Sequence, residues 1–237
     1  MEQVILLAIF SSITSLVTAV AGLGGGVLLL ALMAQLLNPM LLIPLHGIAQ
    51  FFSNFNRGLV HRQQLQWRYL IPFMVGSAAG AFAFLPLVVM VDDRWGGLAL
   101  GIFILIATWR PHWLKLQKMP ALIGGAITSG LGVLFGASGP LAMSAHPKET
   151  WNKLQIVGNH GAAMAFQHGI KVVAYMVGGV QLWGYIPEII ALFVGAWLGT
   201  WVGTLVLHKL TDDRFKTLLN IVLTVLALRL VIIHLFP

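Results

Sequence analysis

Long stretches without a charged residue recur along the chain and dominate its hydrophobic pattern. Residues 4–34, 69–91, 121–145 and 189–207 contain no Asp, Glu, Lys or Arg. A helix needs about 20 apolar residues to cross a bilayer, and each stretch is close to that length or longer. The apolar residues follow one another without alternating with polar ones, which is typical of spanning helices and excludes a transmembrane barrel. The pattern therefore predicts an all-α integral membrane protein.

The two halves of the chain contain the same series of motifs in the same order. Gly22-Leu-Gly-Gly-Gly26 is matched by Gly136-Ala-Ser-Gly-Pro140 at an offset of 114 residues. The same offset relates His46 to His160, and it grows slowly toward the end of each half, as small loop insertions would produce. This ordered series predicts an internal repeat. Further matches are Arg57 with Lys171, Trp67 with Trp183, Tyr69 with Tyr185, Gly76 and Gly80 with Gly195 and Gly199, and Asp92-Asp93-Arg94 with Asp212-Asp213-Arg214.

We therefore predict two four-helix transmembrane repeats, residues 1–118 and 119–237, with about eight spanning helices in all. Glycine-rich segments break the first and fifth of these helices. An even number of spans per repeat would make the repeats parallel, whereas a re-entrant segment would make them inverted, and both arrangements occur in transporters. The predicted spans are 4–34, 40–60, 68–91, 95–110, 120–145, 152–178, 185–208 and 214–235.

Composition narrows the class of protein and its partners. Only 9% of the residues are charged and 58% are hydrophobic, whereas soluble domains carry about 25% charged residues. The net charge of +7 comes mostly from Lys and Arg between the spans, which indicates membrane orientation and not nucleic-acid binding. An anionic substrate is a second contributor. The chain has no Cys, no His/Glu cluster with metal-ligand spacing and no phosphate-binding GxxxxGK[ST] motif, so we predict no cofactor, no metal and no ATP drive.

The basic residues also predict an orientation. In an eight-span count, the three Arg of residues 57–68 and the three basic residues of 110–118 lie on one side of the membrane. Lys and Arg favour the cytoplasmic side, so both termini are predicted to be cytoplasmic, in a bacterial inner membrane. The same count places the basic residues of the second half on the opposite side, which weakens the bias. These are Lys148, Lys153, Lys209, Arg214 and Lys216.

The glycine-rich breaks are candidate binding elements. A helix broken inside the membrane leaves free N–H groups at the start of its second part, and these groups attract anions together with the helix dipole. Interrupted segments at matching positions of two repeats are a good indication of a transporter site. The alternative is close helix packing through small residues. The predicted contacts are Gly24 and Gly25 in the first break and Ser138 and Gly139 in the second.

A polar stripe follows each break. His46, Gln50 and Arg57 share one helix face, and Asn54 flanks them. Polar groups at membrane depth usually face a cavity or the bundle interior, so the stripes predict substrate contacts. The histidines would hydrogen-bond an anion or relay a proton, and the basic residues would raise the local potential. Interhelical hydrogen bonding is the alternative for the histidines, and snorkelling for Arg57. The second stripe contains His160, Gln167 and Lys171, with Asn159 beside it.

One enzyme interpretation competes with transport. Gly136-Ala-Ser138-Gly139 resembles the GxSG motif of rhomboid intramembrane proteases, in which a serine is paired with a histidine. His160 or His168 would be the partner. However, Ser138 aligns with Gly24 of the first half, as expected of a structural turn. We therefore predict that the protein is not an enzyme.

Taken together, these residues resemble the TauE/SafE family of sulfite and organosulfonate exporters. The resemblance rests on Gly22-Leu-Gly-Gly-Gly26, on Asn38-Pro39, on the helix of His46, on the basic segment to Arg68 and on Gly76-Ser-Ala-Ala-Gly80. The series returns in the second half, so the resemblance covers nearly the whole chain.

The resemblance implies a secondary transporter, commonly an exporter, of small sulfur-containing anions. We expect alternating access by rocking of one half against the other, with a proton as the candidate coupling ion. An anion channel is the competing class. The second half departs from the pattern, because Ser138-Gly-Pro140 replaces the fuller glycine run and Met164 stands where Gln50 would be expected. The two half-sites are therefore expected to be unequal.

Overall fold

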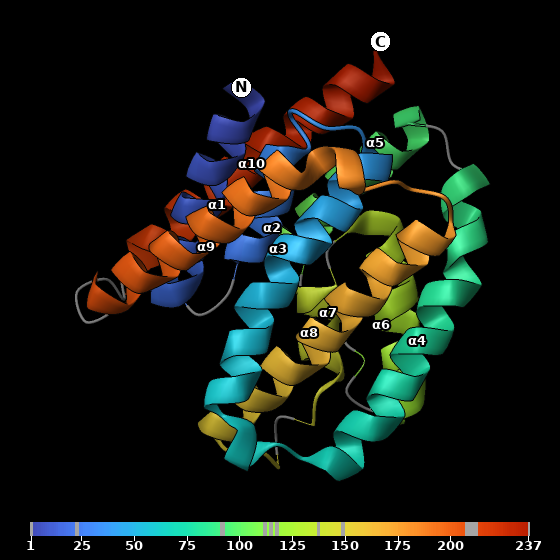
Figure 1. Cartoon of the computed structure of the whole chain (residues 1–237), viewed down its shortest axis with the longest axis vertical. Coiled ribbons are helices and arrows are strands. Elements are labelled where there is room, and N and C mark those ends of the chain that lie inside the picture. The colour runs from blue at the N-terminus through green and yellow to red at the C-terminus, as the bar shows by residue number, and fades with distance from the viewer. Residues whose placement is uncertain are drawn as a thin grey trace.

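All regular structure in the described part of the chain is helical. The computed structural model describes residues 2–21, 24–90, 93–110, 113, 116, 119–136, 138–147, 150–206 and 213–236. Within these ranges there are eight long α-helices and two short ones, which confirms the predicted fold class (Figure 1). They are α1 Glu2–Ala21, α2 Gly25–Met33, α3 Pro39–Val60, α4 Trp67–Met90, α5 Asp93–Trp109, α6 Ala121–Phe135, α7 Gly139–Ala145, α8 Lys153–Val177, α9 Ile186–Val206 and α10 Asp213–Leu235.

An Asn side chain caps the amino end of each of the two helices that contain the polar stripes, α3 and α8. The side chain of Asn38 accepts a hydrogen bond from the Leu41 N–H at the start of α3. Asn152 does the same for Gln155 at the start of α8, where a full capping box forms. Asn caps satisfy N–H groups that have no partner within the helix. Asn38 and Asn152 are separated by the same 114 residues as the predicted repeat motifs.

The chain reverses direction at both glycine-rich breaks. Gly24, with a φ of 97°, precedes α2 and Gly136, with a φ of 78°, follows α6; this left-handed region favours glycine. The short helix then runs back along the long one, so that Gly25 lies against Thr14 and Thr18 of α1. Ala145 of α7 likewise returns to Gly124 of α6. The predicted breaks are present, but the predicted single spans 4–34 and 120–145 are wrong, because each is a helix followed by a re-entrant half-helix.

Glycines bring the first helix of each half against the third helix of the other half. A Cβ on any of these four glycines would overlap a backbone carbonyl of the neighbouring helix, so only glycine fits without a shift. The order of the contacts shows that α4 runs parallel to α6 and that α1 runs parallel to α9. The two halves are therefore interlocked. The contacts are Gly76 with Leu122, Gly80 with Ala126, Gly195 with Ala8 and Gly199 with Ser12.

The second helices of the two halves, α3 and α8, pack against each other in opposite directions. Gly47 of α3 lies beside Lys171, toward the end of α8, whereas Gly58 lies beside Ala162, near its start. The fourth helices are also antiparallel, since the Arg94 Nε of α5 donates to the His234 carbonyl of α10 at 2.9 Å. Every helix of the first half therefore runs opposite to its sequence counterpart in the second. This corresponds to the inverted arrangement of the two that the sequence left open.

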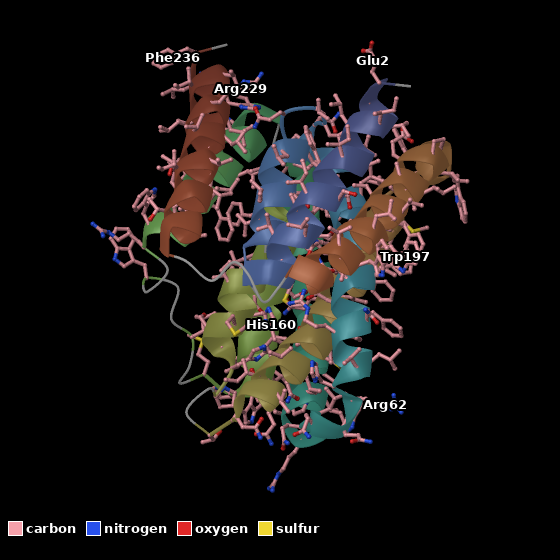
Figure 2. The ribbon with its side chains drawn as sticks, turned by 90° about the vertical axis from the view of Figure 1, so that its left-hand side faces the viewer. Glu2, Arg62, His160, Trp197, Arg229 and Phe236 are labelled. Atoms are coloured by element: carbon pink, nitrogen blue, oxygen red, sulfur yellow. The ribbon has the colours of Figure 1, made fainter. Side chains whose placement is uncertain are left out.

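The outer surface is rich in apolar side chains. Trp197, Val225 and Ile232 are each more than half exposed, and Trp197 projects from the side of the bundle in Figure 2. Among the described residues, the segments Trp67–Val88 and Trp183–Gly203 are long and apolar enough to cross a membrane. Four shorter apolar helices accompany them. Exposed apolar surface of this extent suits contact with lipid.

Substitution of Gly80 tests the interlocked packing. We expect Gly80→Ala to cost about 1–3 kcal/mol, because the added methyl group overlaps the Ala126 backbone and overpacking carries a cost of this size. Each kcal/mol corresponds to about 2–4 °C in a domain of this length. The measurement is thermal unfolding in detergent. Gly184→Ala is the matched control, since its Cβ would meet open space. An equal melting temperature for both variants would contradict the packing.

Candidate functional site

Because α3 and α8 pack in opposite directions, the predicted site residues lie in two separate clusters. His46 and Arg57 are eleven residues apart, so about 16 Å of helix separates them, and they cannot contact one small ion together. His46 instead lies beside Lys171, whose Cε is near Gly47. At the other end of the crossing, Arg57 lies beside Gly161, the neighbour of His160. Each cluster thus combines a histidine from one half with a basic residue from the other.

Lys171 is the basic residue of the first cluster. Its side chain is 2% exposed, and its Nζ donates a hydrogen bond of 2.8 Å to the carbonyl of Gly136. Gly136 caps the carboxyl end of α6, where the helix dipole favours a cation. None of the seven Asp and Glu residues of the sequence belongs to α2, α3, α4, α6, α7 or α8. The ammonium group is therefore held by a neutral carbonyl among helices that contain no carboxylate.

His46 completes the first cluster. It is 1% exposed, and its Nε2 lies 2.9 Å from the carbonyl of Gly26 in the first turn of α2. Because a carbonyl only accepts, Nε2 carries the proton and Nδ1 is an acceptor in the neutral ring. That Nδ1 has no hydrogen-bond partner among the described residues. The ring of His168 is 5.7 Å away, and its Nδ1 is likewise without a partner within this part of the chain.

Gln50 and Asn54 connect this cluster to the first break. The Gln50 side chain lies against Gly26, one residue after the predicted contacts Gly24 and Gly25. Asn54 donates to the Gln50 carbonyl at 2.8 Å, so this amide is engaged with its own helix. The first N–H groups of a helix have no partner within it, and those of α2 therefore begin next to His46 and Gln50. The start of α2 is therefore bordered by two polar side chains, His46 and Gln50.

The second cluster is built around His160 and contains a second histidine, His146, which is not among the predicted site residues. His160 Nδ1 lies 3.1 Å from His146 Nε2, and His146 Nδ1 lies 3.1 Å from the Tyr69 hydroxyl. Tyr69 donates to the Ala145 carbonyl, also at 3.1 Å. Trp151 packs edge-on against Tyr69. His146 directly follows α7, the short helix after the second break. This position beside a predicted binding element could have identified it as a candidate from the sequence.

Two further predicted residues, Asn159 and Gln167, join helices to one another. Asn159 accepts from the Gln66 N–H at 2.7 Å and donates to the Gln64 carbonyl at 3.1 Å, which ties α8 to the start of α4. Gln167 donates to the hydroxyl groups of Ser77 and Thr128 at 3.0 and 2.7 Å. The donors of the Gln167 amide are therefore engaged with α4 and α6, and an anion would find only its carbonyl oxygen.

The second break is tightly packed on one side. The Ser138 side chain is 2% exposed and faces Gly132 of α6, as a structural turn would require. A Cβ on Gly139 would meet open space. Among the described residues, no three His, Asp or Glu side chains gather closely enough to hold a metal ion. The two breaks are unequal in this respect, since Gly25 is in close contact with α1.

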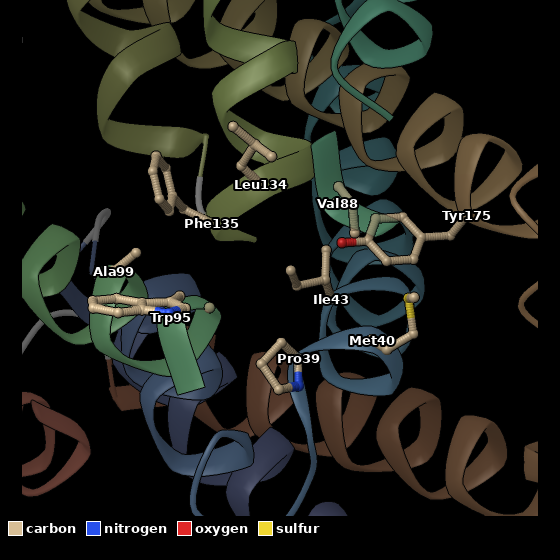
Figure 3. A pocket seen from close by; sticks show the side chains of 10 residues that line it. Pro39, Met40, Ile43, Val88, Trp95, Ala99, Leu134, Phe135 and Tyr175 are labelled. Atoms are coloured by element: carbon tan, nitrogen blue, oxygen red, sulfur yellow. The ribbon is translucent and has the colours of Figure 1, made fainter. Parts of the chain in front are cut away.

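An apolar pocket of about 350 Å³ lies one helical turn from the first cluster. Its wall includes Ile43, one turn before His46 and Gly47, and Tyr175, one turn after Lys171 (Figure 3). The Tyr175 hydroxyl donates to the Val133 carbonyl at 2.8 Å. Other lining residues are Pro39, Trp95, Leu134 and Phe135.

Comparison with known proteins identifies one family. The model of the family described as Sulfite exporter TauE/SafE matches residues 6–230, nearly the whole chain. No curated protein and no solved structure matches the chain.

Replacement of Asn159 separates its structural contacts from a role in binding. We expect Asn159→Ala to cost about 1–3 kcal/mol of stability, because the Gln66 N–H and the Gln64 carbonyl would lose a buried partner. Asn56→Ala, at an exposed position of α3, is the matched control and should leave the melting temperature unchanged. Thermal unfolding in detergent measures both. Unaltered stability of the Asn159 variant would show that these hydrogen bonds do not hold α8 to α4.

Proposed function

The chain belongs to the sulfite exporter TauE/SafE family, and from this premise we propose that it exports a small sulfur-containing anion by alternating access, coupled to a proton. The family consists of multi-pass membrane transporters of sulfite or sulfonates and is not an enzyme family. The protease interpretation of Ser138 is therefore set aside. A secondary transporter also needs no ATP site, in accord with the sequence.

The buried ammonium group of Lys171 is the observation that carries this proposal. An ionised group at membrane depth is costly unless it is paired. Here the hydrogen-bond acceptor is the Gly136 carbonyl, and the surrounding helices contain no carboxylate. A bound anion would supply the missing countercharge. Sulfite and sulfonate groups would also accept hydrogen bonds from the first N–H groups of α2, at Gly24 and Gly25.

The remaining predicted residues take unequal parts in the proposed site. His46 and Gln50 lie beside the start of α2 and would contact the anion together with Lys171. Arg57 and His160 would form a second station at the other end of the α3–α8 crossing, where His146 follows α7. Ser138 and Gly139 follow Gly136 and would belong to the first station, beside Lys171. Asn54, Asn159 and Gln167 would keep these groups in place through their hydrogen bonds. The anion would pass between the two stations during transport.

We further propose that the two halves, residues 1–118 and 119–237, arose by duplication, and that the units that move during transport are helix pairs drawn from both halves. Support comes from the glycine contacts, which recur at equivalent positions between α4 and α6 and between α1 and α9. Because each of these pairs joins both halves, rocking of one half against the other would break them. Relative motion of the α1–α9 pair against the α4–α6 pair preserves both contacts.

Neutralisation of Lys171 tests the proposed site. We expect Lys171→Met to reduce sulfite counterflow in proteoliposomes at least tenfold, because the countercharge for the anion is lost while the side-chain volume is kept. Arg62→Gln is the matched control, since it removes one exposed positive charge and should retain counterflow. Equal flux in both variants would refute the site. A current that grows linearly with voltage and does not saturate with sulfite would support a channel instead.

Substitution of His46 tests proton coupling. Because the Gly26 carbonyl holds Nε2 as a donor, His46 donates to an anion through Nδ1 only when the ring is protonated. His46→Gln retains a donor for Gly26 but has no titratable ring. We expect sulfite flux in this variant to lose its dependence on an imposed pH gradient, measured with a pH-sensitive dye in the vesicles. Coupling equal to that of the unchanged protein would exclude His46 as the coupling residue.

A further inference from the structure

The directions of the helices decide which loops share a side of the membrane. Both ends of the chain lie at one end of the bundle, and we call this the terminal end (Figure 1). Because α3 and α8 are antiparallel and α1 is parallel to α9, α1 and α3 run in the same direction. The re-entrant helix α2 therefore returns the chain to the terminal end before α3 begins, and α7 performs the equivalent return before α8. Each broken segment therefore begins and ends on the same side, unlike the single spans that the eight-span count assumed.

With this tracing, nearly all Lys and Arg residues fall at the end opposite the termini, which we call the basic end. The helix ends that four connections join lie there: α3 with α4, α5 with α6, α7 with α8 and α9 with α10. These connections and the helix turns beside them contain eleven of the fourteen basic residues in the sequence. They are Arg57, Arg62, Arg68, Arg110, Lys115, Lys118, Lys148, Lys153, Lys209, Arg214 and Lys216.

The terminal end contains only two basic residues, and both are engaged with neighbouring groups. Arg94 donates to the carbonyls of His234 and Leu235, and Arg229 donates to the side chain of Gln35. Figure 2 places Glu2, Arg229 and Phe236 at this end and Arg62 at the other. The remaining basic residue, Lys171, lies in the interior.

We propose that the basic end faces the cytoplasm, against the anionic headgroups of the inner leaflet, and that both termini face the exterior. Lys and Arg in short loops govern orientation, and the asymmetry here is eleven to two. Anionic lipids of the cytoplasmic leaflet attract such residues. The eight-span count gave the reverse orientation because it treated each glycine-broken segment as one passage. That count placed the basic loops of the two halves on opposite sides.

This orientation also implies a direction for the transport path, and that implication rests on the proposed function. The basic end concentrates anions at the cytoplasmic surface, where Arg57 and the His160 cluster lie. Lys171 and the apolar pocket lie toward the exterior, since the pocket is lined by the first residues of α3 and α5. An exported anion would therefore meet the two stations in this order.

The absence of Cys from the sequence makes the test direct. Gln63→Cys places a thiol at an exposed position of the basic end, and Gln181→Cys places one at an exposed position of the terminal end. Intact bacterial cells expressing each full-length variant are treated with a membrane-impermeant maleimide. We expect the Gln181 variant to be labelled in intact cells and the Gln63 variant to be labelled only after lysis.

The reverse pattern, or labelling of both variants in intact cells, would overturn the proposal. A C-terminal alkaline phosphatase fusion provides an independent reading: activity supports the exterior terminus, and inactivity with full-length fusion in the membrane contradicts it. Labelling does not depend on transport, so failure of the orientation would leave the Lys171 site standing. Loss of sulfite flux in an otherwise correctly labelled protein would count against the proposed function alone.

Discussion

The close antiparallel packing of α3 against α8 is the constraint on which the rest of the site depends. Gly47, Gly58 and Gly161 allow the two backbones to approach, and side chains at these positions would press on the opposite helix. Because the helices run in opposite directions, His46 meets Lys171, while Arg57 lies near the His160 end. Each cluster therefore needs both halves of the chain. Neither half could form one of the two proposed stations by itself, whatever its own polar stripe contains.

The re-entrant segments α1–α2 and α6–α7 place helix ends, with their free backbone groups, beside the α3–α8 crossing. A buried ammonium group costs several kcal/mol unless acceptors surround it, and α6 ends at Gly136 where its carbonyl groups are available. The first segment presents the opposite helix end, since α2 begins beside His46. A cation-stabilising end and an anion-attracting end thus meet the same part of the α3–α8 crossing. The short helices achieve this inside the bundle, where their unpaired backbone groups are shielded from lipid.

Sequence patterns predicted which polar side chains lie inside the bundle better than they predicted which groups these side chains contact. The polar positions on α3 and α8 and the glycine breaks follow from local rules: His46 and Lys171 are buried, Gln50 is half-buried, and Gly24 and Gly136 have a positive φ. Asn159 and Gln167 show the same pattern, yet their amides hold α8 to α4 and α6. Nothing in a single sequence distinguishes a buried amide that binds a neighbouring helix from one that binds a substrate. His146 lies outside both stripes and joins His160 only through the fold.

The sequence by itself determined that the chain forms apolar helices, where glycine interrupts them, and which motifs recur. These properties are local, because hydropathy, capping and spacing describe one segment at a time. Only the tertiary structure decided that the chain turns back at each break, that His46 lies near Lys171 of the other half, and that equivalent helices of the two halves run in opposite directions. The reason is that direction after a glycine turn depends on distant contacts. Gly25 must fit against Thr14, and Gly80 against Ala126, before the path of the chain is settled.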